Sequence, residues 1–84
     1  MHFIYILRCA DGTLYTGYTR DVDARTKMHN AGKGAKYTCG RRPVELVYRE
    51  TFHDLSAALK REHELKRWSK TRKELLIKKF SSPR

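Results

Sequence analysis

The stretch FIYILRCADGTLYTGYT, residues 3–19, decides the fold. It holds two runs of branched and aromatic residues, 3–9 and 14–18, on either side of a short segment that contains Asp11 and Gly12. Strand-forming runs separated by an Asp-Gly segment are the pattern of a β-hairpin. The first run is apolar at successive positions, which predicts a strand in the centre of its sheet.

The register of this hairpin decides where two tyrosines point. A three-residue loop, Ala10 to Gly12, with Gly12 left-handed, pairs Tyr5 with Gly17. Tyr5 and Tyr15 are then diagonal neighbours on one face of the sheet. A two-residue Asp-Gly turn shifts the register by one and places the two phenols on opposite faces. The sequence permits both loops.

The rest of the chain predicts one more strand and three helices around a basic loop. Turn signals and helix caps set the boundaries. The third strand should place Val44, Leu46 and Tyr48 on one side. The expected segments are a helix from about Asp21 to Asn30 capped by Thr19 or Asp21, a flexible basic loop 31–43, a strand Val44 to Tyr48, a helix capped by Asp54 that reaches about Arg67, and a basic helix of about 69–80 capped by Ser69 or by Thr71 with Glu74. The order ββαβαα predicts an α+β fold, a small three-stranded antiparallel sheet flanked by helices.

Size and charge narrow the range of partners. A chain of 84 residues can bury only roughly 60–65% of its unfolded surface, so we expect a single domain, 1–84. Nineteen Lys and Arg against nine Asp and Glu leave a formal charge of +10, which favours a polyanionic partner, nucleic acid. Ten of the bases lie in residues 60–84, the expected electrostatic footprint. Solvated charge that only serves solubility is the alternative.

Other classes of protein are disfavoured. No run approaches the ~20 apolar residues of a membrane span, and the start lacks the pattern of a signal peptide, so we expect a cytoplasmic protein that binds no membrane. We also expect a monomer. Cys9 and Cys39 match no metal-site spacing and are interpreted as reduced thiols.

Glu62 stands out on the helix predicted to follow Asp54. At 100° per residue from Leu55, Glu62 falls in the middle of the apolar stripe, whereas Glu64 faces water. A carboxylate that faces the core is costly unless it is paired or binds a metal. Helix geometry alone leaves open a metal ligand and an ion pair with Lys66 or Arg25.

The spacing of these residues resembles that of a known family. Tyr5, Tyr15 and Arg25 follow one another in ten-residue steps. With the stretches YILRCADGTLYTGYT, HNAGKGAKYTCGRRPVELVY and ALKREHELK, they resemble the GIY-YIG nucleases over about residues 3–66, and more narrowly the small stand-alone bacterial branch of UPF0213 proteins. The family's first tripeptide is here Phe3-Ile4-Tyr5, which lacks the leading glycine and keeps the tyrosine.

The resemblance implies metal-dependent hydrolysis of phosphodiesters, with DNA favoured over RNA. It implies that Glu62 binds Mg²⁺, for which Mn²⁺ substitutes, and that Arg25 stabilises the scissile phosphate. Mg²⁺ suits one carboxylate because it keeps most of its waters. One of Tyr5 and Tyr15 would help take a proton from the attacking water and the other would hold the phosphate, and either can have either role. His29, one helical turn beyond Arg25, would act as a general base or relay a proton to a tyrosine.

Seven further residues are expected to contact nucleic acid. Most are bases of the loop 31–43. They are Gly17, Lys33, Lys36, Tyr37, Arg41, Arg42 and Lys66. The alternative to the nuclease is a basic module that uses the same surface to bind nucleic acid without cutting it; a third possibility is an assembly role on a ribonucleoprotein.

Overall fold

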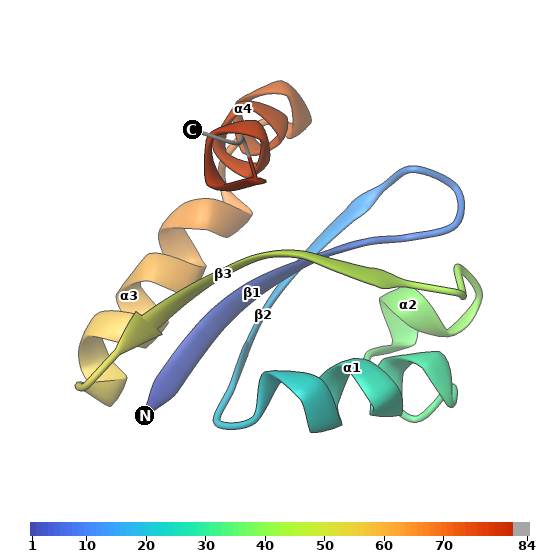
Figure 1. Ribbon diagram of the computed structural model, residues 1–84, viewed down its shortest axis with the longest axis horizontal. Coiled ribbons are helices and arrows are strands. Elements are labelled where there is room, and N and C mark those ends of the chain that lie inside the picture. The colour runs from blue at the N-terminus through green and yellow to red at the C-terminus, as the bar shows by residue number, and fades with distance from the viewer. Residues whose placement is uncertain (82–84) are drawn as a thin grey trace.

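The computed structural model describes residues 1–81, so the last three residues of the expected domain 1–84 lie outside the described part (Figure 1). The elements, in chain order, are β1 (His2–Arg8), β2 (Leu14–Thr19), α1 (Val22–Asn30), α2 (Lys36–Cys39), β3 (Glu45–Phe52), α3 (Leu55–Lys66) and α4 (Lys70–Ser81). The sheet is antiparallel with the order β2-β1-β3, so β1 is central as predicted. The α+β fold is confirmed, and α2 is an addition to the predicted order. No helix within residues 1–81 has the length and apolar character to cross a membrane.

The hairpin has the three-residue loop. Tyr5 pairs with Gly17 across the two strands. The N–H of Cys9 donates to the carbonyl of Thr13 at 2.8 Å, and the N–H of Gly12 donates to the carbonyl of Cys9 at 2.9 Å. Gly12 has a φ of 86°, a left-handed conformation that glycine adopts without strain. The Tyr5 and Tyr15 side chains therefore lie on the same face of the sheet.

Helices cover both faces of the sheet. In Figure 1 the sheet lies between α1 and α2 on one side and α3 and α4 on the other. Successive β1 residues point to opposite faces, as strand geometry requires. The first face buries Tyr5, Leu7 and Cys9 with Val22 and Val44, and the second buries Ile4 with Ala58 and Leu65 and Ile6 with Tyr48 and Ile77.

A β-bulge in β3 corrects one prediction. The pairing with β1 shifts register at Val47, which leaves Val47 as an extra residue. Leu46 therefore packs on the α1 face near Val44, whereas Tyr48 packs against Ile77 of α4. The prediction that Val44, Leu46 and Tyr48 share a side is wrong for Tyr48, because a bulge inserts one residue into the alternation of a strand.

The helices α1, α3 and α4 begin at side-chain caps, whereas α2 does not. Carboxylate or hydroxyl oxygens of Asp21, Asp54 and Ser69 accept a hydrogen bond from the backbone N–H three residues later, at 3.0, 3.1 and 3.2 Å. Of the alternatives left open, Asp21 caps α1 and Ser69 caps α4. The expected capping box of Thr71 with Glu74 does not form, because Glu74 bonds to a strand instead.

Glu74 fastens α4 to the end of β1. The Arg8 guanidinium donates two hydrogen bonds to the Glu74 carboxylate, at 2.5 and 2.8 Å, and Lys70 Nζ lies 3.2 Å from the same carboxylate. The hydrogen bond from Arg8 lowers the pKa of Glu74 to about 2, from its ordinary value of 4.5. A bidentate arginine–carboxylate pair is the strongest geometry for such a bond.

Replacing Glu74 by Gln should lower stability at neutral pH and not at acid pH. The folded pKa is depressed, so the contribution is full above about 4.5 and is lost as the pH falls toward about 2. Both side chains are about a third exposed, so we expect about 1 kcal/mol, or about 4–8 °C in Tm, at pH 7. Thermal melts at pH 7 and pH 2.5 test this expectation, with Glu64→Gln as the control for an exposed pair. An equal Tm difference at both pH values would contradict it.

Candidate active site

The candidate site is centred on Tyr5, whose side chain packs against Gly17 of β2. The Tyr5 side chain is 1% exposed. A Cβ placed on Gly17 would lie 2.5 Å from the Tyr5 hydroxyl and 2.6 Å from Cζ. Position 17 therefore requires glycine, because the phenol of its cross-strand partner fills the space of a side chain. The expected approach of a phosphate to Gly17 stays a prediction.

A row of buried polar side chains begins at Tyr5. His29 of α1 is 0% exposed, and its Nε2 lies 2.9 Å from the Tyr5 hydroxyl. Its Nδ1 lies 2.7 Å from Oγ1 of Thr38, which is also 0% exposed. Thr38 comes from α2, in the segment that the sequence predicted as a flexible loop. Sequence reasoning missed it, because a threonine among loop glycines and lysines gives no signal of burial.

Tyr15 lies beside this row without joining it. Its ring centroid is 6.4 Å from that of Tyr5 and 5.3 Å from that of His29. On its other side Tyr37 stacks at 5.7 Å with an interplanar angle of 30°. Among the hydrogen bonds of residues 1–81, none joins the Tyr15 hydroxyl to His29. The two tyrosines thus differ: only Tyr5 bonds to the imidazole.

Arg25 supplies the positive charge next to Tyr5. It is half-buried, and its Nε is buried with no hydrogen-bond partner within the described part of the chain. No carboxylate forms an ion pair with it among those residues. A guanidinium with an unused donor is suited to bind an anion such as phosphate.

Burial, the largest cause for each group, shifts the pKa values of Tyr5 and His29 so that both are neutral at pH 7. Burial raises the pKa of Tyr5; the hydrogen bond and charge of Arg25 oppose that rise, and the charges of Tyr15 and Glu62 add to it. Burial, followed by the charge of Arg25, lowers the pKa of His29. Tyr5 therefore keeps its proton, and one imidazole nitrogen keeps a free lone pair.

Glu62 lies at the border of the buried face of α3. Its side chain is 19% exposed, against 54% for Glu64, as the helical geometry predicts. The expected place in the middle of the stripe is wrong. Leu55 and Leu59 are 44% and 43% exposed, whereas Leu65 is fully buried. The sheet covers only one flank of the predicted stripe, so the carboxylate sits where core meets solvent.

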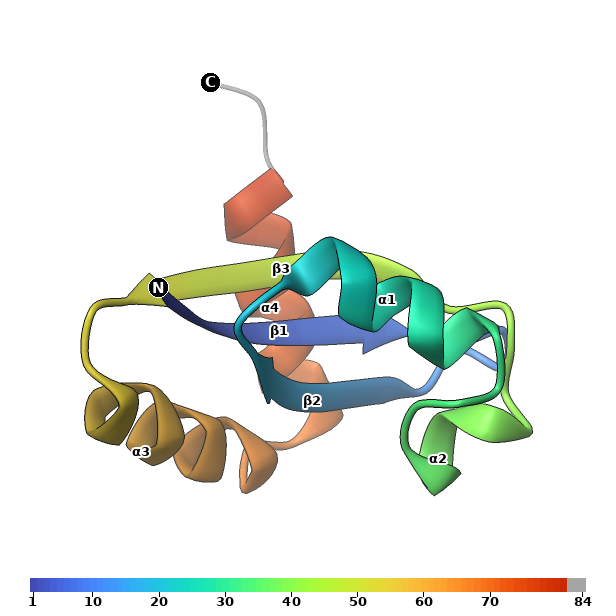
Figure 2. The same cartoon turned by 90° about the horizontal axis from the view of Figure 1, so that it is seen from below.

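Glu62 reaches the site from the other side of the sheet. The sequence predicts that Tyr5, Tyr15, Arg25, His29 and Glu62 converge on one side of the sheet. This prediction is wrong for Glu62, because α3 packs on the face opposite to α1. Figure 2 shows α3 beside β2, the edge strand. Lys66 Nζ lies 3.2 Å from the Glu62 carboxylate, so the ion pair left open by the sequence is present. The charge of Glu62 nevertheless acts on Tyr5.

The donor set suits a weakly held, hydrated cation. Within residues 1–81 no group of three or more His, Cys, Asp or Glu side chains could surround a metal ion. Glu62 is a single, partly exposed carboxylate whose charge acts on Tyr5. Mg²⁺ binds in this manner, through one or two carboxylates with waters and substrate phosphate. A site of the structural zinc type would need four protein ligands, which these residues do not provide.

The basic loop is fastened by its own arginines. Arg41 Nε donates to Asp11 at 3.1 Å and its Nη1 to the carbonyl of Tyr37 at 2.8 Å, while the guanidinium covers the Tyr37 ring at 4.1 Å. Arg42 donates to the carbonyls of Cys39 and Asn30 at 2.8 and 3.3 Å. These contacts order the segment that the sequence predicted as flexible. Phosphate binding by Arg41 and Arg42 stays a prediction, and it would compete with these bonds.

The two loop lysines differ from the arginines. Lys33 and Lys36 are exposed, and neither forms an ion pair within residues 1–81. Their charges are free to meet a polyanion. Tyr37 is 39% exposed, and its ring contacts both the Tyr15 ring and the Arg41 guanidinium.

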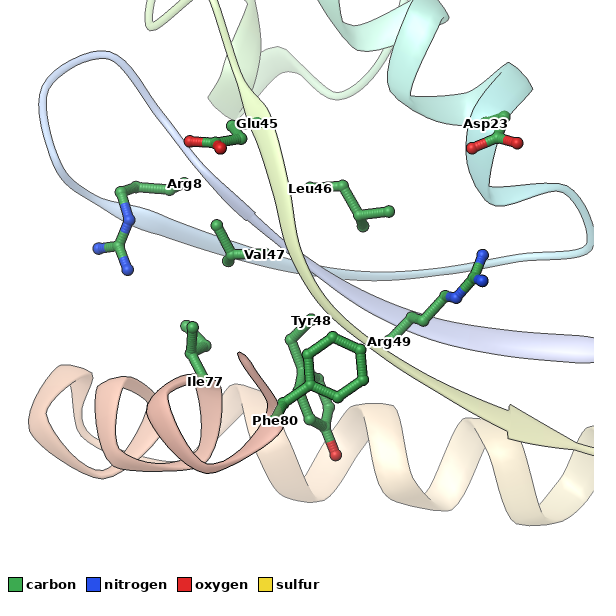
Figure 3. Close-up of a pocket in the computed structure, with 9 residues that line it drawn as sticks. All are labelled: Arg8, Asp23, Glu45, Leu46, Val47, Tyr48, Arg49, Ile77 and Phe80. Atoms are coloured by element: carbon green, nitrogen blue, oxygen red, sulfur yellow. The ribbon is translucent and has the colours of Figure 1, made fainter. Parts of the chain in front are cut away.

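A separate hollow of about 660 Å³ lies along β3, away from the five predicted catalytic residues (Figure 3). At one end the rings of Tyr48 and Phe80 meet edge to face at 5.1 Å. The charged groups around it, Arg8, Asp23, Glu45 and Arg49, are spread over its rim. They do not converge as those around Tyr5 do.

The comparison with known proteins agrees with this geometry. The family model described as GIY-YIG catalytic domain matches residues 1–75. The chain belongs to the GIY-YIG family. A UPF0213 protein of Staphylococcus aureus (strain Mu3) is 57% identical over 77 residues, 92% of this chain and 94% of that protein.

Two solved structures also resemble this GIY-YIG chain. The solution NMR structure of a UPF0213 protein from Bacillus halodurans has 49% identity and a TM-score of 0.64, over 98% of this chain and 87% of the other. A second NMR structure, from E. faecalis, has 40% identity and a TM-score of 0.65, over 99% and 88%. The resemblance to the family and to its UPF0213 branch is thus confirmed.

The buried imidazole predicts acid sensitivity. The folded pKa of His29 lies below its ordinary 6.5, so its contribution to stability is full above about 6.5 and is lost as the pH falls below that value. The Cε1 proton of His29, followed by NMR, should titrate with a midpoint below 6.5, and Tm should be lower at pH 5.5 than at pH 7.5. A midpoint at or above 6.5 would show that the imidazole is not desolvated.

Proposed function

We propose that this GIY-YIG chain is a metal-dependent nuclease that hydrolyses phosphodiester bonds in DNA or structured nucleic acid. The observation that carries the proposal is the environment of the Tyr5 hydroxyl. It bonds to His29 at 2.9 Å, and the charges of Arg25 and Glu62 both act on it. An acid–base pair, an anion-binding cation and a carboxylate whose charges act on one hydroxyl are the groups that phosphodiester hydrolysis needs.

In this proposal Tyr5 takes the proton of the attacking water. As the water oxygen forms its bond to phosphorus, its proton passes to the Tyr5 oxygen, and the Tyr5 proton passes to Nε2 of His29. The bond from phosphorus to the leaving oxygen breaks, and that oxygen takes a proton from solvent. The lowered pKa of His29 keeps the imidazole neutral at pH 7, which is the form that can accept a proton.

The other groups bind and stabilise the phosphate. Arg25, whose Nε is unpartnered within the described residues, donates to the phosphate oxygens as negative charge grows on them. Tyr15, with no bond to His29, positions the phosphate. Glu62 would hold Mg²⁺, or Mn²⁺ in its place, and the metal would supply charge stabilisation at the phosphate when bound. Because Lys66 now pairs with Glu62, that ion pair would have to loosen for Glu62 to bind a metal.

Nucleic acid is the proposed partner, with DNA the first substrate to test and the protein acting as a monomer. The charge of +10 supports a polyanion, and Lys33 and Lys36 on the loop next to the site form no ion pair within residues 1–81. The rival is a module that binds through the same surface and does not cut.

Nicking of supercoiled plasmid in Mg²⁺, Mn²⁺ or EDTA tests the chemistry. Glu62→Ala should abolish nicking and leave binding in EDTA nearly intact, because binding without metal does not use the carboxylate. Arg25→Ala should lower the rate by ~10²–10³, the range for loss of one transition-state contact. Glu64→Ala, exposed on the same helix, is the matched control and should keep the wild-type rate.

Two results would count against the nuclease. A folded Glu62→Ala protein that nicks at the wild-type rate would remove Glu62 from the mechanism. Binding that does not respond to metal, with no nicks by the wild type, would favour the binding module. A thermal melt of each variant shows whether loss of the Glu62–Lys66 ion pair has unfolded it.

Salt dependence tests the electrostatic part. Affinity for duplex DNA should fall with a log–log slope of about −0.9 per phosphate neutralised. Lys33→Ala with Lys36→Ala should make the slope shallower by about one to two units and leave Tm unchanged, since both lysines are exposed. Arg41→Ala with Arg42→Ala should also lower Tm, because those side chains fasten the loop. An affinity that barely changes between low and physiological salt would contradict a polyanionic partner.

A further inference from the structure

We propose that Thr38 fixes the tautomer of His29, so that the imidazole presents an unprotonated Nε2 to the Tyr5 hydroxyl. This inference rests on the proposed function, in which Nε2 receives the Tyr5 proton. It adds a positioning residue, Thr38, to which the sequence motifs assigned no role.

Water has no access to this imidazole. His29 and Thr38 are both 0% exposed. The two ring nitrogens are each held by one hydroxyl: Nε2 lies 2.9 Å from Tyr5 and Nδ1 lies 2.7 Å from Thr38. The tautomer of a neutral imidazole is set by the hydrogen bonds of its nitrogens, so these two hydroxyls decide which nitrogen carries the proton.

The position of the Thr38 proton follows from a third contact. Thr38 Oγ1 lies 2.9 Å from the carbonyl oxygen of Ala35, which can only accept a hydrogen bond. The single hydroxyl proton of Thr38 therefore points to Ala35, and Oγ1 can only accept from His29. Nδ1 carries the proton, Nε2 is free, and Tyr5 donates to it.

One contact favours the opposite tautomer, and it is the weakest. The N–H of Ala35 lies 3.4 Å from Nδ1, near the long limit for a hydrogen bond. If Nδ1 accepted from both Ala35 and Thr38, the Thr38 oxygen would face the Ala35 carbonyl at 2.9 Å with no proton between them. The two short contacts, at 2.7 and 2.9 Å, outweigh the long one.

The conformation of the loop 31–43 places Thr38 next to Nδ1 of His29. A Cβ on Gly34 would overlap Nδ1 of His29, so only glycine lets the chain pass over the imidazole. The N–H of Thr38 donates to the Ala35 carbonyl at 3.1 Å, and the carbonyl of Thr38 accepts from the N–H of Arg41 at 3.0 Å. The hydroxyl is thus positioned before any substrate binds.

NMR of the unmodified protein reads the tautomer directly. Two-bond ¹H–¹⁵N correlations of the His29 ring should identify Nδ1 as the protonated nitrogen at pH 7.5. In Thr38→Val the remaining hydrogen-bond partner of Nδ1 among the described residues is the Ala35 N–H, a donor, so the ring should shift toward the Nε2–H tautomer. Nicking should then fall about tenfold or more, the effect of one misplaced hydrogen bond. Thr38→Ser keeps the hydroxyl and should restore both the tautomer and the rate.

Each contrary result has a defined meaning. An Nε2–H tautomer in the wild type overturns the inference, as does an unchanged tautomer or an unchanged nicking rate in a folded Thr38→Val protein. If Thr38→Val does not fold, the wild-type spectrum and Thr38→Ser decide: a wild-type Nε2–H ring, or loss of the Nδ1–H tautomer in the serine variant, overturns it. The NMR readout needs no cleavage, so absence of nicking by the wild type rejects the proposed function and leaves the spectra to decide on Thr38.

Discussion

The packing of the Tyr5 phenol across Gly17 is the constraint on which the candidate site depends. It needs the three-residue loop, because only that register sets Tyr5 opposite Gly17. It also needs glycine, because any Cβ at position 17 would meet the phenol. The Tyr5 phenol lies over β2, and its hydroxyl bonds to His29 of the neighbouring helix α1. A loop one residue shorter would turn one of the two tyrosines to the α3 face, so Tyr5, Tyr15 and His29 would no longer lie together.

The second constraint is the cost of burying polar groups in a small core. Tyr5, His29 and Thr38 are each at most 1% exposed, and an unpaired hydroxyl or imidazole at such depth is strongly unfavourable. Their mutual bonds satisfy them, ending at the Ala35 carbonyl. A satisfied polar network inside a core specifies one arrangement, since every alternative leaves a group unpaired. The bonds that satisfy Tyr5, His29 and Thr38 therefore also fix how these three side chains are arranged.

The sequence predicted what local chemistry determines. The Asp-Gly segment predicted a hairpin, and Asp21, Asp54 and Ser69 cap helices as their residue types indicate. It could not decide between the two hairpin registers, because the same residues are compatible with a two-residue and a three-residue turn. Packing across the sheet decides the register.

Features that depend on tertiary contacts were missed. The bulge at Val47 breaks an alternation that looks regular, and the loop 31–43 is ordered by arginine bonds to backbone carbonyls that no composition reveals. The helical stripe correctly separated Glu62 from Glu64. It misplaced the centre of the buried face, because a helical wheel does not show how much of the helix the sheet covers.

The position of Glu62 relative to Tyr5 depends on how the helices pack on the two faces of the sheet. Tyr5, Tyr15, Arg25 and His29 come from one face, and the carboxylate comes from a helix on the other, beside the edge strand. Its place relative to Tyr5 is set by how α3 packs on β1 and β2, through the fully buried Ala58 and Leu65. The Lys66 ion pair holds the same carboxylate. In the proposed function, a metal that bound Glu62 would have to replace that lysine as its partner, so the cost of breaking the ion pair would count against metal affinity.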